Sequence, residues 1–225
     1  MRKLGKITLT IVLLIGGAVL WYNLAYPTYT CRYRLSIAVD VGGETKTASS
    51  VIEVILATRL LPEIFSPVER SVYGDAVFLD MGSKGNVVVL LACGPDGTEG
   101  CVAEFVPQTF GVSGDLENLP RLQALRGSRD LTGKFMPTLI TFGNLTDPKS
   151  ARVVAPDRFE QVFGPVVHFK RVWIEMTDAP VTRGIERKLP WWNRPGRPAL
   201  EAYRAWLEGK TNGPSVGPET LFKRG

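Results

Sequence analysis

The sequence predicts an α+β protein, in which an N-terminal transmembrane helix precedes a domain built on a mainly antiparallel β-sheet with a few short helices. Three observations predict this. An uncharged run of 20 residues, Ile7 to Tyr26, follows a basic start. Later segments alternate apolar and polar residues and are separated by glycine-rich turns, as strands in hairpins are. Only a few short stretches carry apolar residues at helical spacing.

The first 26 residues have the pattern of a membrane anchor. A 20-residue helix is about 30 Å long, which matches the hydrocarbon core of a bilayer. Arg2, Lys3 and Lys6 favour a cytoplasmic start, and three aromatic residues stand at the far end, where interfacial rings concentrate. We therefore expect a cytoplasmic segment at 1–6, an anchor at 7–26 in the inner membrane, and the remainder outside the cytoplasm.

One alternative for this segment stays open. Gly16, Gly17 and Ala18 are small residues of the kind that signal peptidases cut after. Cleavage there would release a soluble exported binding protein.

The exported part opens with a predicted β-hairpin. Tyr33, Leu35, Ile37 and Val39 alternate on one face of a strand at 33–40. Arg32, Arg34 and Ser36 occupy the opposite face. Gly42-Gly43 supplies a tight turn, and a second strand is expected at about 46–55.

The rest of the domain is expected to hold further strands and short helices. An irregular connection is expected at 60–70, because Pro62 and Pro67 interrupt it. Residues 101–110 fit a short helix or a strand. The remaining expected strands lie at 76–81, 86–92 (buried on both faces), 135–142 and 166–176. In the last of these, Val167, Phe169 and Trp173 alternate, and a bulge is expected near Lys170-Arg171. Helices are expected at 116–126, starting late because of Pro120, and at 156–164, ending at Gly164.

Composition divides the chain into an exported domain at 27–188 and an arm at 189–225. The arm is rich in proline, and only 199–208 in it fits a helix. Residues 27–182 hold 15 basic and 18 acidic residues, whereas 183–225 hold nine basic and four acidic. A nucleic-acid-binding domain would need a basic stripe, so the sequence predicts no nucleic-acid partner.

The three cysteines predict one candidate disulfide. Cys93 and Cys101 bracket a turn-rich insert, and export would place them in an oxidising compartment. Cys31 is then left over. Two unpaired thiols are the alternative.

The sequence assigns no catalytic, cofactor-binding or metal-binding residue. The glycine-rich stretch at 127–135 departs from a phosphate-binding loop in its spacing and lacks the required hydroxyl residue, and no dinucleotide fingerprint follows a strand, so no nucleotide is expected. His168 is the single histidine and sits mid-strand, where we interpret it as a solvated side chain. One histidine and no Cys-x-x-Cys make a poor metal set.

Paired carboxylates are the catalytic alternative that the sequence leaves open, because their separation in space cannot be read along the chain. Asp75, Asp80, Glu53 and Glu175 lie on or near predicted strands.

The best candidate contact surface is the aromatic and cationic cluster at the start of the arm. Trp191, Trp192, Arg194 and Arg197 combine the residue types that protein and glycan contacts favour. The alternative is that the two tryptophans pack the arm onto the domain.

Several segments resemble a family of uncharacterised bacterial proteins. They are the hairpin from Tyr33-Arg34-Leu35 to Ser49-Ser50-Val51-Ile52-Glu53-Val54, Asp147-Pro148-Lys149, Phe163-Gly164-Pro165, and Asp178 to Trp191. The resemblance implies one homologous unit across much of residues 31–191 and brings no known activity with it.

The function expected from the sequence is therefore a membrane-tethered, non-enzymatic interaction or assembly module of the bacterial cell envelope. Its partners would be the membrane, through residues 7–26, and an envelope protein or glycan. An envelope hydrolase that uses a carboxylate pair is the rival interpretation.

Overall fold

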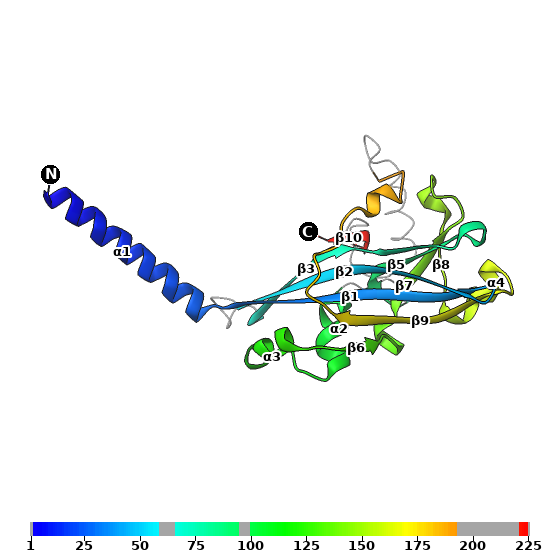
Figure 1. Cartoon of the computed structure of the whole chain (residues 1–225), viewed down its shortest axis with the longest axis horizontal. Coiled ribbons are helices and arrows are strands. Elements are labelled where there is room, and N and C mark those ends of the chain that lie inside the picture. The colour runs from blue at the N-terminus through cyan, green and yellow to red at the C-terminus, as the bar shows by residue number, and fades with distance from the viewer. Residues whose placement is uncertain (1, 59–65, 95–99, 193–220, 225) are drawn as a thin grey trace.

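The computed structural model describes residues 2–58, 66–94, 100–192 and 221–224 (Figure 1). It is an α+β fold with antiparallel sheets and few helices, as predicted. Its helices and strands, in chain order, are α1 (Arg2–Ala25), β1 (Thr28–Val41), β2 (Glu44–Thr58), β3 (Val68–Asp75), β4 (Val77–Asp80), β5 (Asn86–Cys93), α2 (Cys101–Phe110), α3 (Leu119–Ala124), β6 (Ser128–Asp130), β7 (Pro137–Phe142), β8 (Ala151–Val153), α4 (Phe159–Phe163), β9 (Val167–Met176) and β10 (Lys223–Arg224).

Helix α1 projects away from the domain at the start of β1 (Figure 1). Among the described residues, no helix combines the length and the hydropathy that a membrane span requires.

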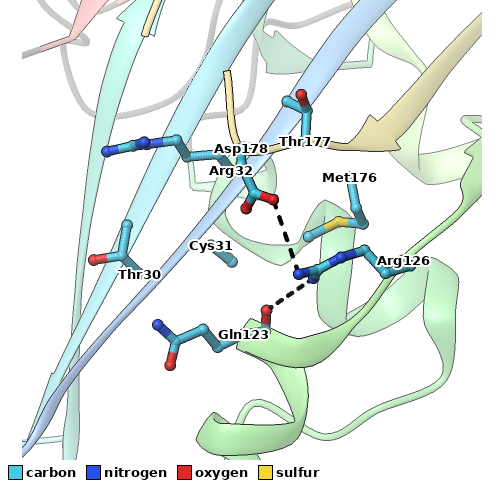
Figure 2. A pocket seen from close by; sticks show the side chains of 8 residues that line it. All are labelled: Thr30, Cys31, Arg32, Gln123, Arg126, Met176, Thr177 and Asp178. Atoms are coloured by element: carbon cyan, nitrogen blue, oxygen red, sulfur yellow. Dashed lines mark hydrogen bonds and ion pairs between the residues drawn. The ribbon is translucent and has the colours of Figure 1, made fainter. Parts of the chain in front are cut away.

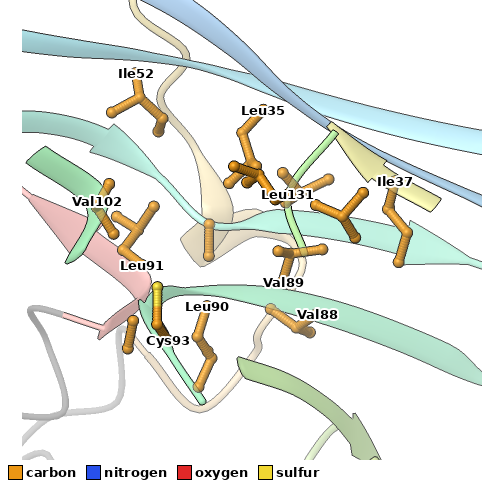
Figure 3. Packing of buried hydrophobic residues seen from close by; sticks show 14 of the residues in the cluster. Leu35, Ile37, Ile52, Val88, Val89, Leu90, Leu91, Cys93, Val102 and Leu131 are labelled. Atoms are coloured by element: carbon orange, nitrogen blue, oxygen red, sulfur yellow. The ribbon is translucent and has the colours of Figure 1, made fainter. Parts of the chain in front are cut away.

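The strands form two antiparallel sheets. The first has the strand order β10-β3-β2-β1-β9-β6, and the second has the order β4-β5-β7-β8. Apolar side chains from both sheets meet in one core, with Leu35, Ile37 and Ile52 on the first sheet lying towards Val89 and Leu91 on β5 (Figure 3). Burial of each such aliphatic side chain stabilises the fold by about 1.5–3 kcal/mol.

The long hairpin of β1 and β2 forms the centre of the first sheet. The two strands pair without interruption from Thr28 opposite Ala57 to Val41 opposite Glu44. Gly42 and Gly43 both adopt positive φ angles, 63° and 88°, as the two central residues of a type I′ hairpin turn do. The predicted hairpin is confirmed, and it is longer at both ends than the alternation indicated.

Strand β5 is buried along its whole length, which confirms a strand covered on both faces. Helix α2 forms where the sequence allowed either a helix or a strand. Helix α3 begins only at Leu119 with Pro120 in its first turn, and α4 ends at Gly164 with φ at 100°, as predicted.

The predicted bulge in β9 is confirmed and reverses the faces of the strand. Ala38 pairs with Arg171 and Val39 with Phe169, so Lys170 is the extra residue. A one-residue insertion moves the following side chains to opposite faces. As a result Val172 and Ile174 face the core, and Trp173 points away from it instead of continuing the alternation of Val167 and Phe169.

Four strands were not predicted. The prediction of an irregular connection at 60–70 is wrong for residues 68–70, because β3 begins at Val68. Residues 59–65 lie outside the described part of the chain. Strand β3 is mostly polar and is held by its pairing with β2. Strands β6, β8 and β10 are two or three residues long and carry no periodic signal. The helix expected at 199–208 also lies outside the described residues.

The segment after β9, residues 177–183, crosses the first sheet, and we call it the strap. At one end the backbone N–H of Thr177 donates to the carbonyl of Arg32 on β1 (3.1 Å). At the other end Thr182 exchanges two hydrogen bonds with Val51 on β2 (3.1 and 2.9 Å). Because the inner face packs on the second sheet, the strap passes over the outer face (Figure 1).

Candidate functional site

A groove of about 370 Å³ lies on the outer face of the first sheet, and we call it the outer-face groove. Three internal strands, β1, β2 and β9, position the side chains that line it. The lining residues are Arg34, Ser36, Thr47, Ala48, Ser49, Trp173 and Glu175.

The strand register explains why a groove forms here. Ser36 on the central strand lies between Ser49 on β2 and Trp173 on β9. One row further, Ala38 takes the central position. Ser36 and Ala38 are small and almost fully covered (2% and 5% exposed), so the centre is low and the longer side chains on either side form the walls.

Most side chains that line the groove are polar and are not paired with other groups of the described chain. Within the described part of the chain, five of them form no hydrogen bond or ion pair, although Arg34 and Glu175 lie directly opposite each other in the register. These five are Arg34, Ser36, Thr47, Ser49 and Glu175. Thr47, Ser49 and Glu175 are exposed, and polar groups that converge on a concavity can fix the orientation of a bound ligand.

Trp173 supplies the aromatic surface of the groove. The guanidinium of Arg171 stacks over the indole at 4.2 Å from the ring centroid, and it also lies 3.5 Å from the carboxylate of exposed Asp130. A cation over a tryptophan ring at an exposed site contributes about 0.5–1 kcal/mol. The stack therefore restrains the indole at the edge of the groove.

A second cleft, of about 290 Å³, lies between the beginning of β1, the end of α3 and the end of β9. Figure 2 shows Arg126 of this cleft directed at Asp178 of the strap, and the two side chains are 3.9 Å apart. Arg32 in the same cleft donates to Glu53 at 2.6 Å. The cleft residues are Thr30, Cys31, Arg32, Gln123, Arg126, Met176, Thr177 and Asp178. Its two cations already have carboxylate partners, in contrast to the side chains of the outer-face groove.

The cysteines divide as the sequence suggested. Cys93 and Cys101 form a disulfide with an S–S distance of 2.08 Å, and Cys31 is a buried free thiol. Burial raises the pKa of the Cys31 thiol from 9.0 to about 11, and the nearby Glu53 adds to the rise. A thiol that stays protonated is a poor nucleophile, so Cys31 is a core residue and not a reactive one.

The candidate contact cluster at the start of the arm requires a correction. Trp191 is fully buried, with its ring 6.0 Å from that of Phe142 on β7 and 5.8 Å from that of Phe222. Trp192 is half-buried against the same cluster. Trp191 therefore packs the chain onto the outer face of the second sheet and is not a partner contact. Arg194 and Arg197 lie outside the described residues.

The candidate carboxylates are separated. Asp80 accepts from the backbone N–H of Gly82 in a turn, and Glu53 pairs with Arg32. Glu175 alone of the four lines the outer-face groove. His168 is exposed, with Nδ1 2.8 Å from the carboxylate of Glu160. Among the described residues, no three His, Cys, Asp or Glu side chains are grouped to hold a metal ion.

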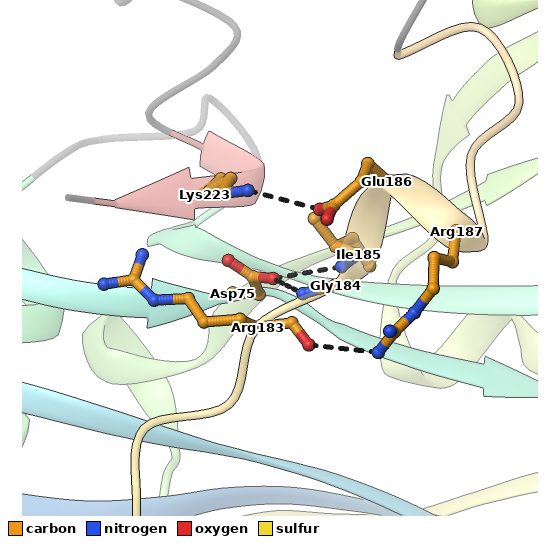
Figure 4. Close-up of polar contacts among 7 residues, drawn as sticks. All are labelled: Asp75, Arg183, Gly184, Ile185, Glu186, Arg187 and Lys223. Carbon is orange, nitrogen blue, oxygen red and sulfur yellow. Dashed lines mark hydrogen bonds and ion pairs between the residues drawn. The ribbon is translucent and has the colours of Figure 1, made fainter.

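Asp75 holds a structural junction (Figure 4). Its Oδ2 accepts from the backbone N–H groups of Gly184 (2.5 Å) and Ile185 (3.0 Å), just past the strap. The side chain is 1% exposed. Nearby, Lys223 of β10 pairs with Glu186 at 3.2 Å, so both chain segments are fastened to the edge of the first sheet.

The sequence held a signal for part of the groove, namely the placement of Arg34 and Ser36 opposite the core. For Trp173 the signal was the bulge predicted near Lys170-Arg171, although the alternation with Val167 and Phe169 did not show that the bulge turns this ring away from the core.

Comparison with known proteins finds no protein-family model, no curated protein and no solved structure that matches the chain.

Proposed function

We propose that this protein is a membrane-tethered module of the bacterial cell envelope that binds a partner through the outer-face groove and performs no chemistry on it. The observation that carries the proposal is the convergence of five polar side chains without internal partners on one groove of a rigid sheet. By contrast, two other arginines are paired internally, Arg32 with Glu53 and Arg70 with Glu104.

The tether is supported by the sequence and by the exposure of α1. The run from Ile7 to Tyr26 carries no charge. The large apolar side chains described on α1, from Ile11 to Leu24, are 48–74% exposed. An apolar surface of that extent is unfavourable in water and favours burial in lipid. In this arrangement the domain lies outside the cytoplasm, directly after the anchor.

A binding role is favoured over hydrolysis by the composition of the groove. Hydrolysis by a carboxylate pair needs two carboxyl groups on either side of the reacting bond. The groove lining contains one, Glu175. Asp75 and Asp80, the other strand-end acids, are engaged in holding backbone N–H groups.

The test combines topology with crosslinking in the full-length protein. Cells would express the protein with a C-terminal tag and a photoreactive phenylalanine analogue at Thr45, an exposed residue beside the groove on the same face of β2 as Thr47. The matched control carries the analogue at Arg152, an exposed residue on β8 of the second sheet. We expect the tag to pellet with membranes and to be removed by protease in spheroplasts, and we expect crosslinks from position 45 that are absent from 152.

Three outcomes contradict the proposal. A protected tag would overturn the outward orientation. A tagged domain in the soluble fraction after export would overturn the tether. Equal crosslinking from both positions would show that the groove is not the binding surface.

A further inference from the structure

We infer that the outer-face groove takes an uncharged glycan segment, an inference that rests on the proposed binding function and names its ligand class. The juxtaposition that points to it is one indole, Trp173, beside three side-chain hydroxyls and an opposed guanidinium and carboxylate.

The position of the groove argues against an extended peptide. Peptides that bind sheets by strand addition pair with the free backbone of an edge strand. The groove is centred on β1, which pairs with β2 on one side and β9 on the other, and β9 itself pairs with β6 at Trp173 and Glu175. Only β2 has a one-sided pairing here, since β3 pairs with it from Glu53 onwards. Over β1 and β9, recognition must therefore come from side chains.

The side-chain set matches a hydroxyl-rich ligand. Ser36, Thr47 and Ser49 each both donate and accept, as sugar hydroxyls do. Arg34 offers a planar fork of donors, and Glu175 across from it offers two acceptor oxygens. Of two adjacent hydroxyls on a sugar ring, one can accept a hydrogen bond from Arg34 and the other can donate one to Glu175.

The burial of Ser36 strengthens the match. The residue is 98% covered by its neighbours and lies at the floor of the groove, and within the described chain its hydroxyl has no hydrogen-bond partner. Its Oγ is reached from the groove, so a bound ligand can use this hydrogen-bonding capacity in place of water.

Charge and shape narrow the ligand further. The lining carries one cation and one anion, so it does not select phosphate or another strong anion. Arg171 covers one face of the indole, and the part of the ring that lines the groove offers an apolar surface to the C–H side of a sugar ring.

The test is calorimetric titration of the full-length protein in detergent micelles. The probes are cellotetraose, maltotetraose and chitotetraose, which vary linkage and acetamido groups and carry no charge. We expect saturable binding of at least one probe. Ser49→Tyr fills the groove from an exposed position without touching the core, and Trp173→Ala removes the indole. Each should weaken that binding by about tenfold or more, the loss of one good contact.

Arg152→Ala is the matched control and should leave the affinity unchanged. If Trp173→Ala does not fold, Ser49→Tyr still decides the matter. Absence of saturable binding to every probe overturns the glycan inference, as does binding that Ser49→Tyr leaves intact.

The crosslink at position 45 separates the two failures. No glycan binding together with a specific protein crosslink would retain the binding module and replace its ligand class. No glycan binding and no specific crosslink would remove both.

Discussion

The carboxylate of Asp75 accepts a hydrogen bond from the backbone N–H of Ile185 at 3.0 Å across a separation of 110 residues. The same oxygen accepts from the N–H of Gly184. This contact fastens the end of the strap to the edge of β3, immediately before the chain turns towards buried Trp191.

Replacing Asp75 should therefore loosen the strap. Asp75→Ala leaves two backbone N–H groups without their acceptor, and each such loss costs about 1–3 kcal/mol. We expect the free energy of unfolding, measured by urea titration with tryptophan fluorescence, to fall by about 2–4 kcal/mol. Asp75→Asn keeps an acceptor oxygen and should lose less. Asp80→Ala, which removes an exposed turn cap, is the control, and an equal loss there would contradict the structural role of Asp75.

The two tryptophans of the arm should behave differently from each other. Trp191→Ala removes a fully buried ring from the Phe142 and Phe222 cluster and should cost about 3–5 kcal/mol of stability. Trp192→Ala, at a half-buried position, should cost less. Thermal unfolding of both variants measures the difference. Unchanged stability of the Trp191→Ala variant would contradict the packing role of Trp191 and favour a partner contact instead.

The Cys93–Cys101 disulfide should contribute measurably to stability. Closing so short a loop is worth about 2 kcal/mol in the chain-entropy model. Mass spectrometry of a non-reducing digest should find the linked peptides, and Cys101→Ser should lower the urea midpoint. Reduction should destabilise the wild type and leave Cys101→Ser unchanged. Free thiols at both positions in exported protein would refute the bond.

The Cys31 thiol gives a pH dependence with a definite sign. Its pKa is raised from 9.0 to about 11 in the folded state, so the unfolded chain loses this proton first as the pH rises. The stabilisation is fully present below pH 9.0 and is lost as the pH rises towards about 11. The unfolding free energy of the wild type relative to Cys31→Ala should thus fall by up to about 2 kcal/mol over that interval.

Thiol modification provides an independent check of the same feature. Cys31 should resist N-ethylmaleimide at neutral pH in the folded protein and react readily in urea. Rapid modification of the folded protein would contradict its burial.

The first sheet was the part of the fold most open to prediction. Tyr33, Leu35, Ile37 and Val39 alternate without interruption, and a half-buried strand needs no more than that pattern to be recognised. Gly42-Gly43 fixed the turn for a local reason, since both positions require positive φ. Strand β3 was missed because its burial comes from its neighbours and not from its own apolar content.

The candidate site was predictable only in part. Arg34 and Ser36 were placed opposite the core by their position in the alternation. The meeting of Ser36 with Ser49 and Trp173 depends on the registers of two strand pairs, and the register of β9 depends on its bulge. Trp191 shows the converse, because the residue types of a contact surface are also those of a buried aromatic anchor.

The sequence by itself determined the features that depend on near neighbours: the apolar run before the domain, the alternation of β1, the hairpin turn, the late start of α3, the stop of α4 at Gly164 and the burial of β5. Only the tertiary structure decided which polar side chains lack internal partners, where the strap is fastened, and on which side Trp173 and Trp191 lie. Periodicity is set by a few adjacent residues, whereas these contacts join positions up to 131 residues apart, as Val51 and Thr182 are. Contacts at that separation are set by strand register and packing, which no local pattern specifies.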